Sequence, residues 1–192
     1  MINPGVNPTE RVFSPQTVCV PATGVYIARA LNPNVPGTVA EVLALASDMG
    51  APYGAGANYT KLAAAMQKRY GLSGTVIEGG AQAQTAVKYA VERGVYAVGL
   101  AGDQVNLTPH YQPNSVGHSI AVLYTLGLWG LQLDPLAPAG YKGDPFGAAE
   151  LNAFCTAAIL FKVPDTADCT AQVKAATDAL VKKIAAAKQA LG

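Results

Sequence analysis

The residues of this chain best suited to chemistry are a cysteine near its start and two histidines in its second half. Cys19 lies in the stretch SPQTVCVPATG, at the start of a segment that predicts a helix. At a helix N-terminus the dipole and the unpaired N–H groups favour the thiolate form of a cysteine. A thiolate nucleophile needs a base, most often histidine, and the two histidines are His110 and His118. His110 lies in a loop rich in Pro, Asn and Gln, whereas His118 opens a strand-like run and is therefore the better base.

Asp134 is the candidate partner that would orient His118. A catalytic imidazole needs a hydrogen-bond partner on the ring nitrogen that does not face the nucleophile. Asp134 ends the next strand-like run, and a hairpin around residues 126–128 would bring both side chains to one end of a sheet. Taken singly, each residue also has an ordinary structural interpretation, as a buried inert thiol, a structural histidine or a turn aspartate. The joint arrangement is more specific than any of its members.

The predicted elements that would position these residues change from helices to strands along the chain. Apolar residues at helical spacing predict helices over residues 19–31, 38–49, 59–70 and 82–93. Extended apolar runs predict strands over residues 74–80, 95–102, 117–125 and 129–135, and further helices are predicted over 146–162 and 170–191. Helices followed by an antiparallel sheet indicate an α+β fold rather than alternating βαβ units. We expect one domain over residues 1–145, beginning with an extended arm over 1–18, and a C-terminal helical extension over 146–192.

The composition argues against several classes of partner. The chain has 192 residues and a formal net charge of +1 with scattered Lys and Arg, so no nucleic-acid partner is expected. The most apolar window, residues 119–133, is shorter than the ~20 residues that span a bilayer, so no membrane helix is expected. The first residues lack the apolar segment of a secretory signal. No cluster of His, Cys, Asp or Glu has the spacing of a metal site, so we expect no metal and no cofactor.

Two features of the C-terminal part of the chain, a pair of cysteines and a heptad-like segment, each allow two interpretations. Cys155 and Cys169 flank the sequence VPDTAD, where they either form a disulfide or remain buried free thiols. Over residues 170–191 the less polar positions alternate in steps of four and three. That spacing is typical of a coiled coil, which would mean self-association or a partner helix, and equally of an amphipathic helix packed on its own domain.

These residues and motifs together resemble those of the papain-like cysteine peptidases, nearest to the C39-like group. The sequence CVPAT at residues 19–23 is similar to the CGPA motif in which that group's nucleophile opens the first helix. Gly117-His118 matches the group's Gly-His motif at the start of a strand, and Asp134-Pro135 matches its Asp-Pro motif after the next strand. The resemblance covers about residues 15–145 and implies a papain-like fold. It implies that Cys19 is the nucleophile, His118 the base and Asp134 the residue that orients the base.

The sequence departs from that group's pattern beside the nucleophile. Val20 stands where the group has glycine, and Phe13 stands where the group commonly has its oxyanion-hole glutamine, six residues before the cysteine. Gln16, three residues before Cys19, is the remaining side-chain candidate for an oxyanion donor, beside backbone N–H groups near Cys19. Removing such a donor typically costs about 10²–10³ in rate. The alternative to an enzyme is therefore a catalytically inactive papain-like module that acts as a phage structural or interaction protein.

The resemblance also suggests a substrate and a location. C39-like domains are found in bacteriophage lysins, and this chain resembles such a module. The implied activity is a thiol endopeptidase that hydrolyses the stem or cross-link peptides of bacterial cell-wall peptidoglycan. We expect the protein in a phage virion, or in the host cytoplasm with holin-dependent release to the cell wall.

Overall fold

The computed structural model describes residues 15–51, 58–94, 96–103, 106, 117–124, 128–135 and 143–162, without the side chains of residues 15–17. Within these ranges the chain forms five helices and one six-stranded antiparallel sheet, so the predicted α+β class is confirmed. The helices are α1 (Pro15–Leu31), α2 (Val39–Asp48), α3 (Tyr59–Tyr70), α4 (Gly80–Val91) and α5 (Ala148–Phe154). The strands are β1 (Thr75–Glu78), β2 (Tyr96–Asp103), β3 (Gly117–Tyr124), β4 (Gly130–Leu133), β5 (Asp144–Phe146) and β6 (Ala157–Lys162).

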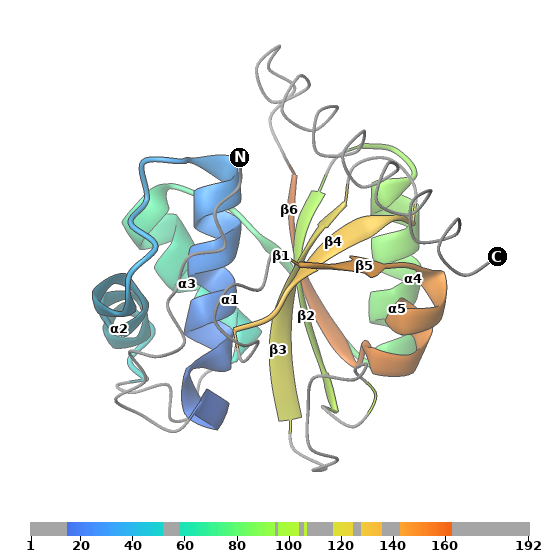
Figure 1. Ribbon diagram of the computed structural model, residues 1–192, viewed down its shortest axis with the longest axis horizontal. Coiled ribbons are helices and arrows are strands. Elements are labelled where there is room, and N and C mark those ends of the chain that lie inside the picture. Colours follow the sequence, from blue (N-terminus) through green and yellow to red (C-terminus); the bar gives the residue numbers. More distant parts are fainter. Residues whose placement is uncertain are drawn as a thin grey trace, which may run out of the picture.

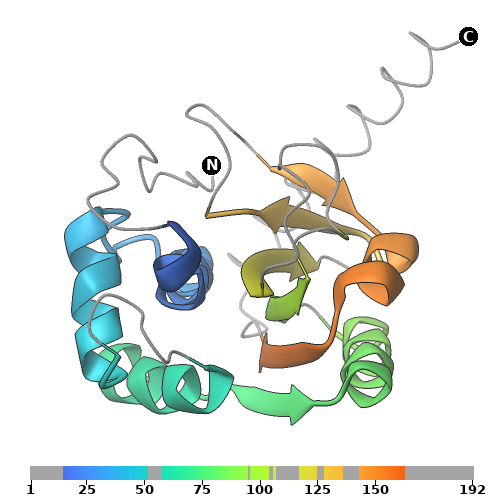
Figure 2. The same ribbon diagram turned by 90° about the horizontal axis from the view of Figure 1, so that it is seen from below.

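The sheet lies between two groups of helices, with α1, α2 and α3 on one face and α4 and α5 on the other (Figures 1 and 2). Its strand order is β1-β6-β2-β3-β4-β5, and β2 and β3 lie in the middle. Successive strand residues point to opposite faces. Ala97 and Ala121 therefore belong to the core beneath α1, whereas Val98 and Ile120 belong to the core beneath α4 and α5. Most residues of β2 and β3 are therefore buried, and these two strands form the centre of the sheet.

The helix ends follow the capping residues in the sequence. The Thr38 hydroxyl accepts a hydrogen bond from the Glu41 N–H at the start of α2, and Asn58 accepts one from the Lys61 N–H at the start of α3. α3 ends at Gly71, whose φ of 68° is a left-handed conformation that glycine adopts without steric cost. Threonine and asparagine suit the N-cap position because their side-chain oxygens satisfy a backbone N–H that has no partner within the helix.

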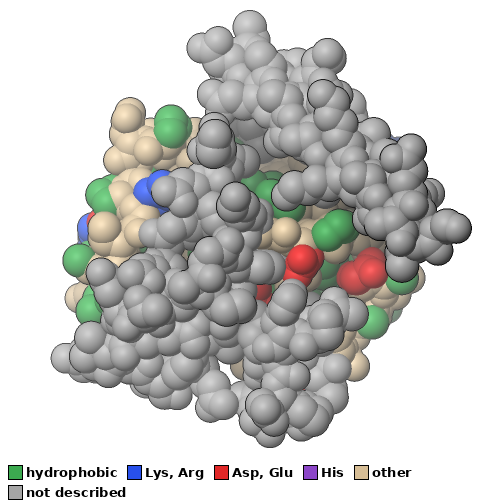
Figure 3. All heavy atoms as spheres, in the orientation of Figure 1, with side chains coloured by type: hydrophobic (Ala, Val, Ile, Leu, Met, Phe, Trp, Pro, Cys, Tyr) green, Lys and Arg blue, Asp and Glu red, His purple; other side chains and the backbone are tan. Residues whose placement is uncertain are grey.

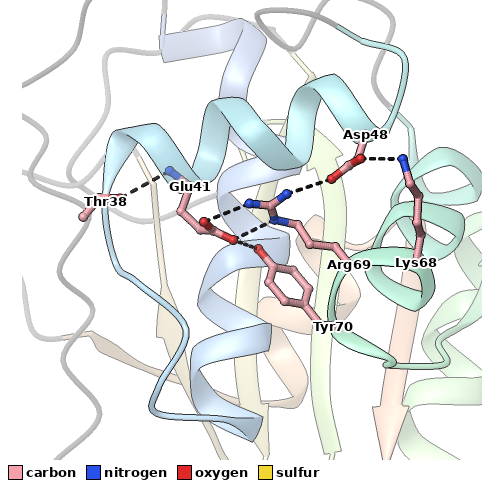
Figure 4. Close-up of polar contacts among 6 residues, drawn as sticks. All are labelled: Thr38, Glu41, Asp48, Lys68, Arg69 and Tyr70. Carbon is pink, nitrogen blue, oxygen red and sulfur yellow. Dashed lines mark hydrogen bonds and ion pairs between the residues drawn. The ribbon is translucent and has the colours of Figure 1, made fainter.

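The carboxylate of Glu41 contributes to a network of ion pairs between α2 and α3 rather than to its own helix end (Figure 4). The Arg69 guanidinium donates to both Glu41 oxygens, at 2.8 and 3.1 Å, and to Asp48 at 2.9 Å. Tyr70 donates its hydroxyl proton to Glu41 at 2.7 Å, and Lys68 binds Asp48 at 2.7 Å. These contacts hold α2 against α3, and α2 and α3 both pack on α1.

The first helix begins earlier than the sequence predicts. α1 starts at Pro15 instead of Cys19, so residues 15–18 are helical, and the rest of the expected arm, residues 1–14, lies outside the described part of the chain. Pro21 consequently lies inside the helix, beyond the first turn in which a proline is best tolerated. A proline there provides no N–H for the carbonyl four residues earlier. The N-terminal end of α1 therefore holds together less firmly than the rest of the helix.

The predicted helix over residues 146–162 is wrong for most of its length. The chain there forms the end of β5, the short helix α5 and then β6, which lies between β1 and β2. Residues 158–161 of β6 are all buried, and a continuous apolar run of this kind gives no periodicity that distinguishes a strand from a helix. The domain boundary expected between residues 145 and 146 falls inside β5, so the sheet extends beyond it. The helix expected over 170–191 lies outside the described residues.

The apolar window at residues 119–133 forms strands of the sheet rather than a membrane-spanning helix. None of the described helices has the length and apolar character needed to cross a bilayer. Residues 119–124 and 130–133 belong to β3 and β4.

On the face shown in Figure 3, acidic side chains lie over β4 and β5. The visible Lys and Arg side chains lie on the side of the molecule formed by α1, α2 and α3.

Candidate active site

Three secondary-structure elements bring the predicted site residues to one end of the sheet. Cys19 lies near the start of α1, His118 is the second residue of β3, and Asp134 directly follows β4. The starts of α1 and β3 lie at the same end of the molecule (Figures 1 and 2). Because β4 runs antiparallel to β3 and Leu133 pairs with Ala121, Asp134 lies beside the first residues of β3. The hairpin geometry predicted for His118 and Asp134 is confirmed.

His118 and Asp134 form a buried hydrogen-bonded pair. The Nε2 atom of His118 lies 2.9 Å from Oδ1 of Asp134, and each side chain is 1% exposed. His118 also shares a side-chain hydrogen bond with Cys19. Since Nε2 is directed at Asp134, Nδ1 is the ring nitrogen that remains for the thiol. The structure therefore places Cys19, His118 and Asp134 in one line of contacts, and their catalytic roles stay a prediction.

The environment of His118 favours its charged form. Burial lowers the pKa of His118, but the hydrogen bonds to Asp134 and Cys19 and the charges on those two residues raise it, and the net result is a pKa of about 9. At neutral pH the imidazole therefore carries its second proton. An imidazolium beside a sulfur stabilises the thiolate, and it also holds the proton that a leaving group needs.

The candidate oxyanion donors are only partly described. Gln16 lies on α1 one turn before Cys19, but its side chain lies outside the described residues, so its predicted role stays a prediction. Because α1 starts at Pro15, the N–H of Cys19 falls beyond the first turn, whose N–H groups alone lack a partner in the helix. This differs from the expectation of a cysteine at the mouth of the helix. Val20 directly follows Cys19 and packs, partly buried, against the core between the sheet and helices α1, α2 and α3.

Two polar residues beside the site were missed by the sequence analysis. Thr23 follows Cys19 by one helical turn, Ser119 directly follows His118, and both are fully buried in mainly apolar surroundings. A hydroxyl residue inside an apolar run is the signal that could have identified them, since a buried hydroxyl needs a partner.

The described residues include one further cysteine and no candidate cluster of metal ligands. Among the described residues no group of three or more His, Cys, Asp or Glu could hold a metal ion. Cys155 is a buried free thiol that donates to the carbonyl of Ala157 at 3.6 Å, and burial raises its pKa to about 11. Its expected partner in the disulfide alternative, Cys169, lies outside the described part of the chain.

Comparison with known proteins adds little to this geometry. The chain is similar in structure to the Pseudomonas avirulence protein AvrPphB, with a TM-score of 0.38 and 15% sequence identity over 77% of this chain and 91% of that chain. At this TM-score the similarity carries no argument about fold or function. No protein-family model matches the sequence, and no curated protein matches it significantly. The function must therefore be inferred from the site itself.

Proposed function

We propose that the protein is a cysteine peptidase with a papain-like arrangement of its catalytic residues. The observation that supports this is the line of contacts from Cys19 through His118 to Asp134, assembled from an N-terminal helix and two antiparallel strands. A nucleophile, a base in contact with it and a residue that orients the base are the parts that thiol catalysis requires.

The proposed reaction follows from the charges of these groups. The Cys19 sulfur attacks the carbonyl carbon of a peptide bond, and a C–S bond forms as the carbonyl π-bond opens to an oxyanion. His118 then donates its proton to the leaving amine as the oxyanion reforms the carbonyl and the C–N bond breaks, which leaves the acyl group on the Cys19 sulfur as a thioester. A water molecule, deprotonated by the now neutral His118, attacks the thioester, which releases the acid and restores Cys19. Asp134 stabilises the imidazolium and keeps the ring oriented throughout.

The site is deeply placed, which determines how it should be probed. Counted over the whole residue, backbone included, Cys19 is 5% exposed and His118 3%, so a small reagent tests the sulfur more directly than a protein substrate. We expect iodoacetamide to label Cys19 of the full chain faster than Cys155, because burial raises the pKa of the Cys155 thiol and no histidine is among the causes that shift it. The labelled peptides are identified by mass spectrometry.

Matched variants separate the proposal from simple exposure. His118→Ala should slow the labelling of Cys19 and leave that of Cys155 unchanged, and Cys19→Ala should abolish the hydrolysis of a fluorescent casein while Cys155→Ala retains it. A Cys19 that reacts no faster than Cys155, together with no hydrolysis, would contradict the peptidase. That result would favour the inactive structural module.

The substrate and the location stay predictions from the resemblance to phage lysins. The expected substrate is a stem or cross-link peptide of peptidoglycan. Purified cell walls of several cross-link types, incubated with the wild-type chain and with Cys19→Ala, test it through the new amino groups released. Release by the wild-type chain alone supports the cell-wall assignment, and hydrolysis of casein without release from any wall contradicts it.

A further inference from the structure

A chain of three buried hydroxyl groups joins the helix of Cys19 to the strand of His118. Ser119 Oγ donates a hydrogen bond to Thr23 Oγ1 at 3.0 Å, and the hydroxyl of Tyr59 lies 2.9 Å from Ser119 Oγ. A serine hydroxyl has one proton, and that of Ser119 is used toward Thr23, so Tyr59 is the donor to Ser119. The chain links α3, β3 and α1, which are distant in the sequence.

The link lies beside both reacting groups. Thr23 lies four residues after Cys19 and so on the same face of α1, about 6 Å along the helix axis. Ser119 is covalently adjacent to His118 in β3, and because successive strand residues point to opposite faces, it acts on His118 through the backbone rather than through side-chain contact. Pro21 lies between Cys19 and Thr23 and weakens the helix's own hydrogen bonding at that point. An anchor from outside the helix therefore acts where α1 is least able to hold its own position.

The burial of these hydroxyls argues against a role in packing alone. Thr23 and Ser119 are fully buried and Tyr59 is 5% exposed. Burial raises the pKa of Tyr59 well above its usual value, so its hydroxyl stays a neutral donor. Placing polar groups in a core costs free energy that apolar residues avoid. What the hydroxyls add is direction, since hydrogen bonds have a preferred geometry and apolar contacts do not.

The surrounding glycines show how closely α1 is fitted. A Cβ on Gly99 of β2 would lie 3.1 Å from Thr23 Cγ2 and 3.3 Å from the Tyr59 hydroxyl. A Cβ on Gly24 of α1 would lie 2.6 Å from Leu62 and 2.7 Å from Leu45. The helix therefore has close neighbours in the sheet on one side and in α2 and α3 on the other.

We propose that Thr23, Ser119 and Tyr59 are positioning residues that set the distance and orientation between Cys19 and His118. The inference rests on the proposed function, because it assigns these residues a role in the same reaction. In this role they do not contact the substrate peptide. Their effect is on the contact between the thiol and the imidazole.

The test compares the alkylation of Cys19 by a neutral and an anionic reagent in the full chain. An imidazolium beside the sulfur favours anionic iodoacetate over neutral iodoacetamide, so the ratio of the two rates reports the charge of His118. In the wild-type chain the ratio should fall around the His118 pKa of about 9. In Tyr59→Phe we expect Cys19 to be alkylated roughly tenfold more slowly than in the wild type. This loss is smaller than the ~10²-fold loss that a 1 Å misplacement can cause. In this variant the ratio of the two rates should also fall at a lower pH than in the wild type, because the contact with Cys19 helps to raise the pKa of His118.

Two matched comparisons separate positioning from general damage. Tyr124→Phe removes a buried hydroxyl that has no hydrogen-bond partner among the described residues, and it should leave rate and pH profile unchanged. Thr23→Val should behave like Tyr59→Phe, whereas Thr23→Ser, which keeps the hydroxyl, should retain the wild-type profile. Circular dichroism shows that each variant is folded, and if Tyr59→Phe is not, the Thr23 pair gives the answer.

The outcomes distinguish this inference from the proposed function. A reactive wild-type Cys19 with an unchanged rate and profile in Thr23→Val and Tyr59→Phe overturns the positioning role and leaves the peptidase intact. A wild-type Cys19 that reacts no faster than Cys155 overturns both.

Discussion

Replacing Asp134 by asparagine should change the charge of the histidine at the centre of the site. The substitution keeps the shape of the side chain and removes its negative charge. Asp134 contributes to the high pKa of His118 through both its hydrogen bond and its charge. Asp134→Asn therefore tests whether His118 rests as an imidazolium because of this partner.

The expected change is large compared with the precision of a titration. Burial lowers the pKa of His118, and the contacts with Asp134 and Cys19 raise it from 6.5 to about 9. That net rise means that the folded protein favours the charged form of His118 by about 3 kcal/mol more than water favours that of an unperturbed histidine. In Asp134→Asn the opposing influence of burial remains while the main source of the rise is lost. We expect His118 of the variant to titrate near or below its ordinary pKa of 6.5.

The same shift predicts how stability depends on pH. A folded pKa above the unfolded value stabilises the protein fully below about 6.5, and this contribution is lost as the pH rises through about 9. The difference in free energy of unfolding between the wild type and Asp134→Asn should therefore be largest in mildly acidic solution, at no more than about 3 kcal/mol. It should shrink steadily toward alkaline pH.

Proton NMR of the imidazole measures the pKa directly. The chain has two histidines, so a His110→Gln background leaves His118 as the source of the signal. Asp144→Asn, on β5, is the matched control, since Asp144 is not among the causes that shift the pKa of His118. A wild-type His118 that titrates near 6.5, or a pKa unmoved in Asp134→Asn, would refute the reasoning.

Three further predictions concern the fold. Glu41→Gln should lower the free energy of unfolding by about 1 kcal/mol at neutral pH. This loss should fade in acid, because Arg69 holds the pKa of Glu41 below 4.5 and the stabilisation by the carboxylate disappears as the pH falls through that lowered value. Urea unfolding at several pH values measures this, and an equal loss in acid would contradict it. Gly102→Ala should destabilise by about 3 kcal/mol, since its Cβ would overlap the carbonyl of Phe154, whereas Gly117→Ala, which meets no atom within 4 Å, should unfold near the wild-type temperature. A chain truncated after residue 145 should show no cooperative thermal unfolding by circular dichroism, because it lacks β6 between β1 and β2; a wild-type melting curve would show that the boundary expected at 145 is real.

The central part of the fold could be predicted because its signals are local. Thr38, Asn58 and Gly71 mark helix ends by their own chemistry, and the structure has helix ends at all three. The alternation of residue types from His118 to Asp134 predicts two neighbouring strands, and the antiparallel pair β3 and β4 confirms them. The approach of His118 to Asp134 follows from that hairpin alone.

The errors arise where long-range packing overrides local pattern. The run AAILFK is compatible with a helix, and it becomes a strand because β1 and β2 on either side satisfy its backbone groups. Helices α3 and α4 pack against its two faces and bury them. No local rule indicates that a segment near residue 160 completes the middle of a sheet begun at residue 75. The start of α1 is a smaller error of the same kind, since Pro21 suggests a first turn and is tolerated inside the helix.

The sequence by itself determined which groups could react, because a thiol, an imidazole and a carboxylate are properties of residue type, and it determined the hairpin that unites His118 with Asp134. Only the tertiary structure decided that Cys19 meets His118, because that contact depends on how α1 packs against β3 rather than on any pattern near either residue. It also revealed the hydroxyl chain of Tyr59, Ser119 and Thr23. Its hydrogen bonds join residues 60 and 96 positions apart, and spatial proximity at that separation is created by folding.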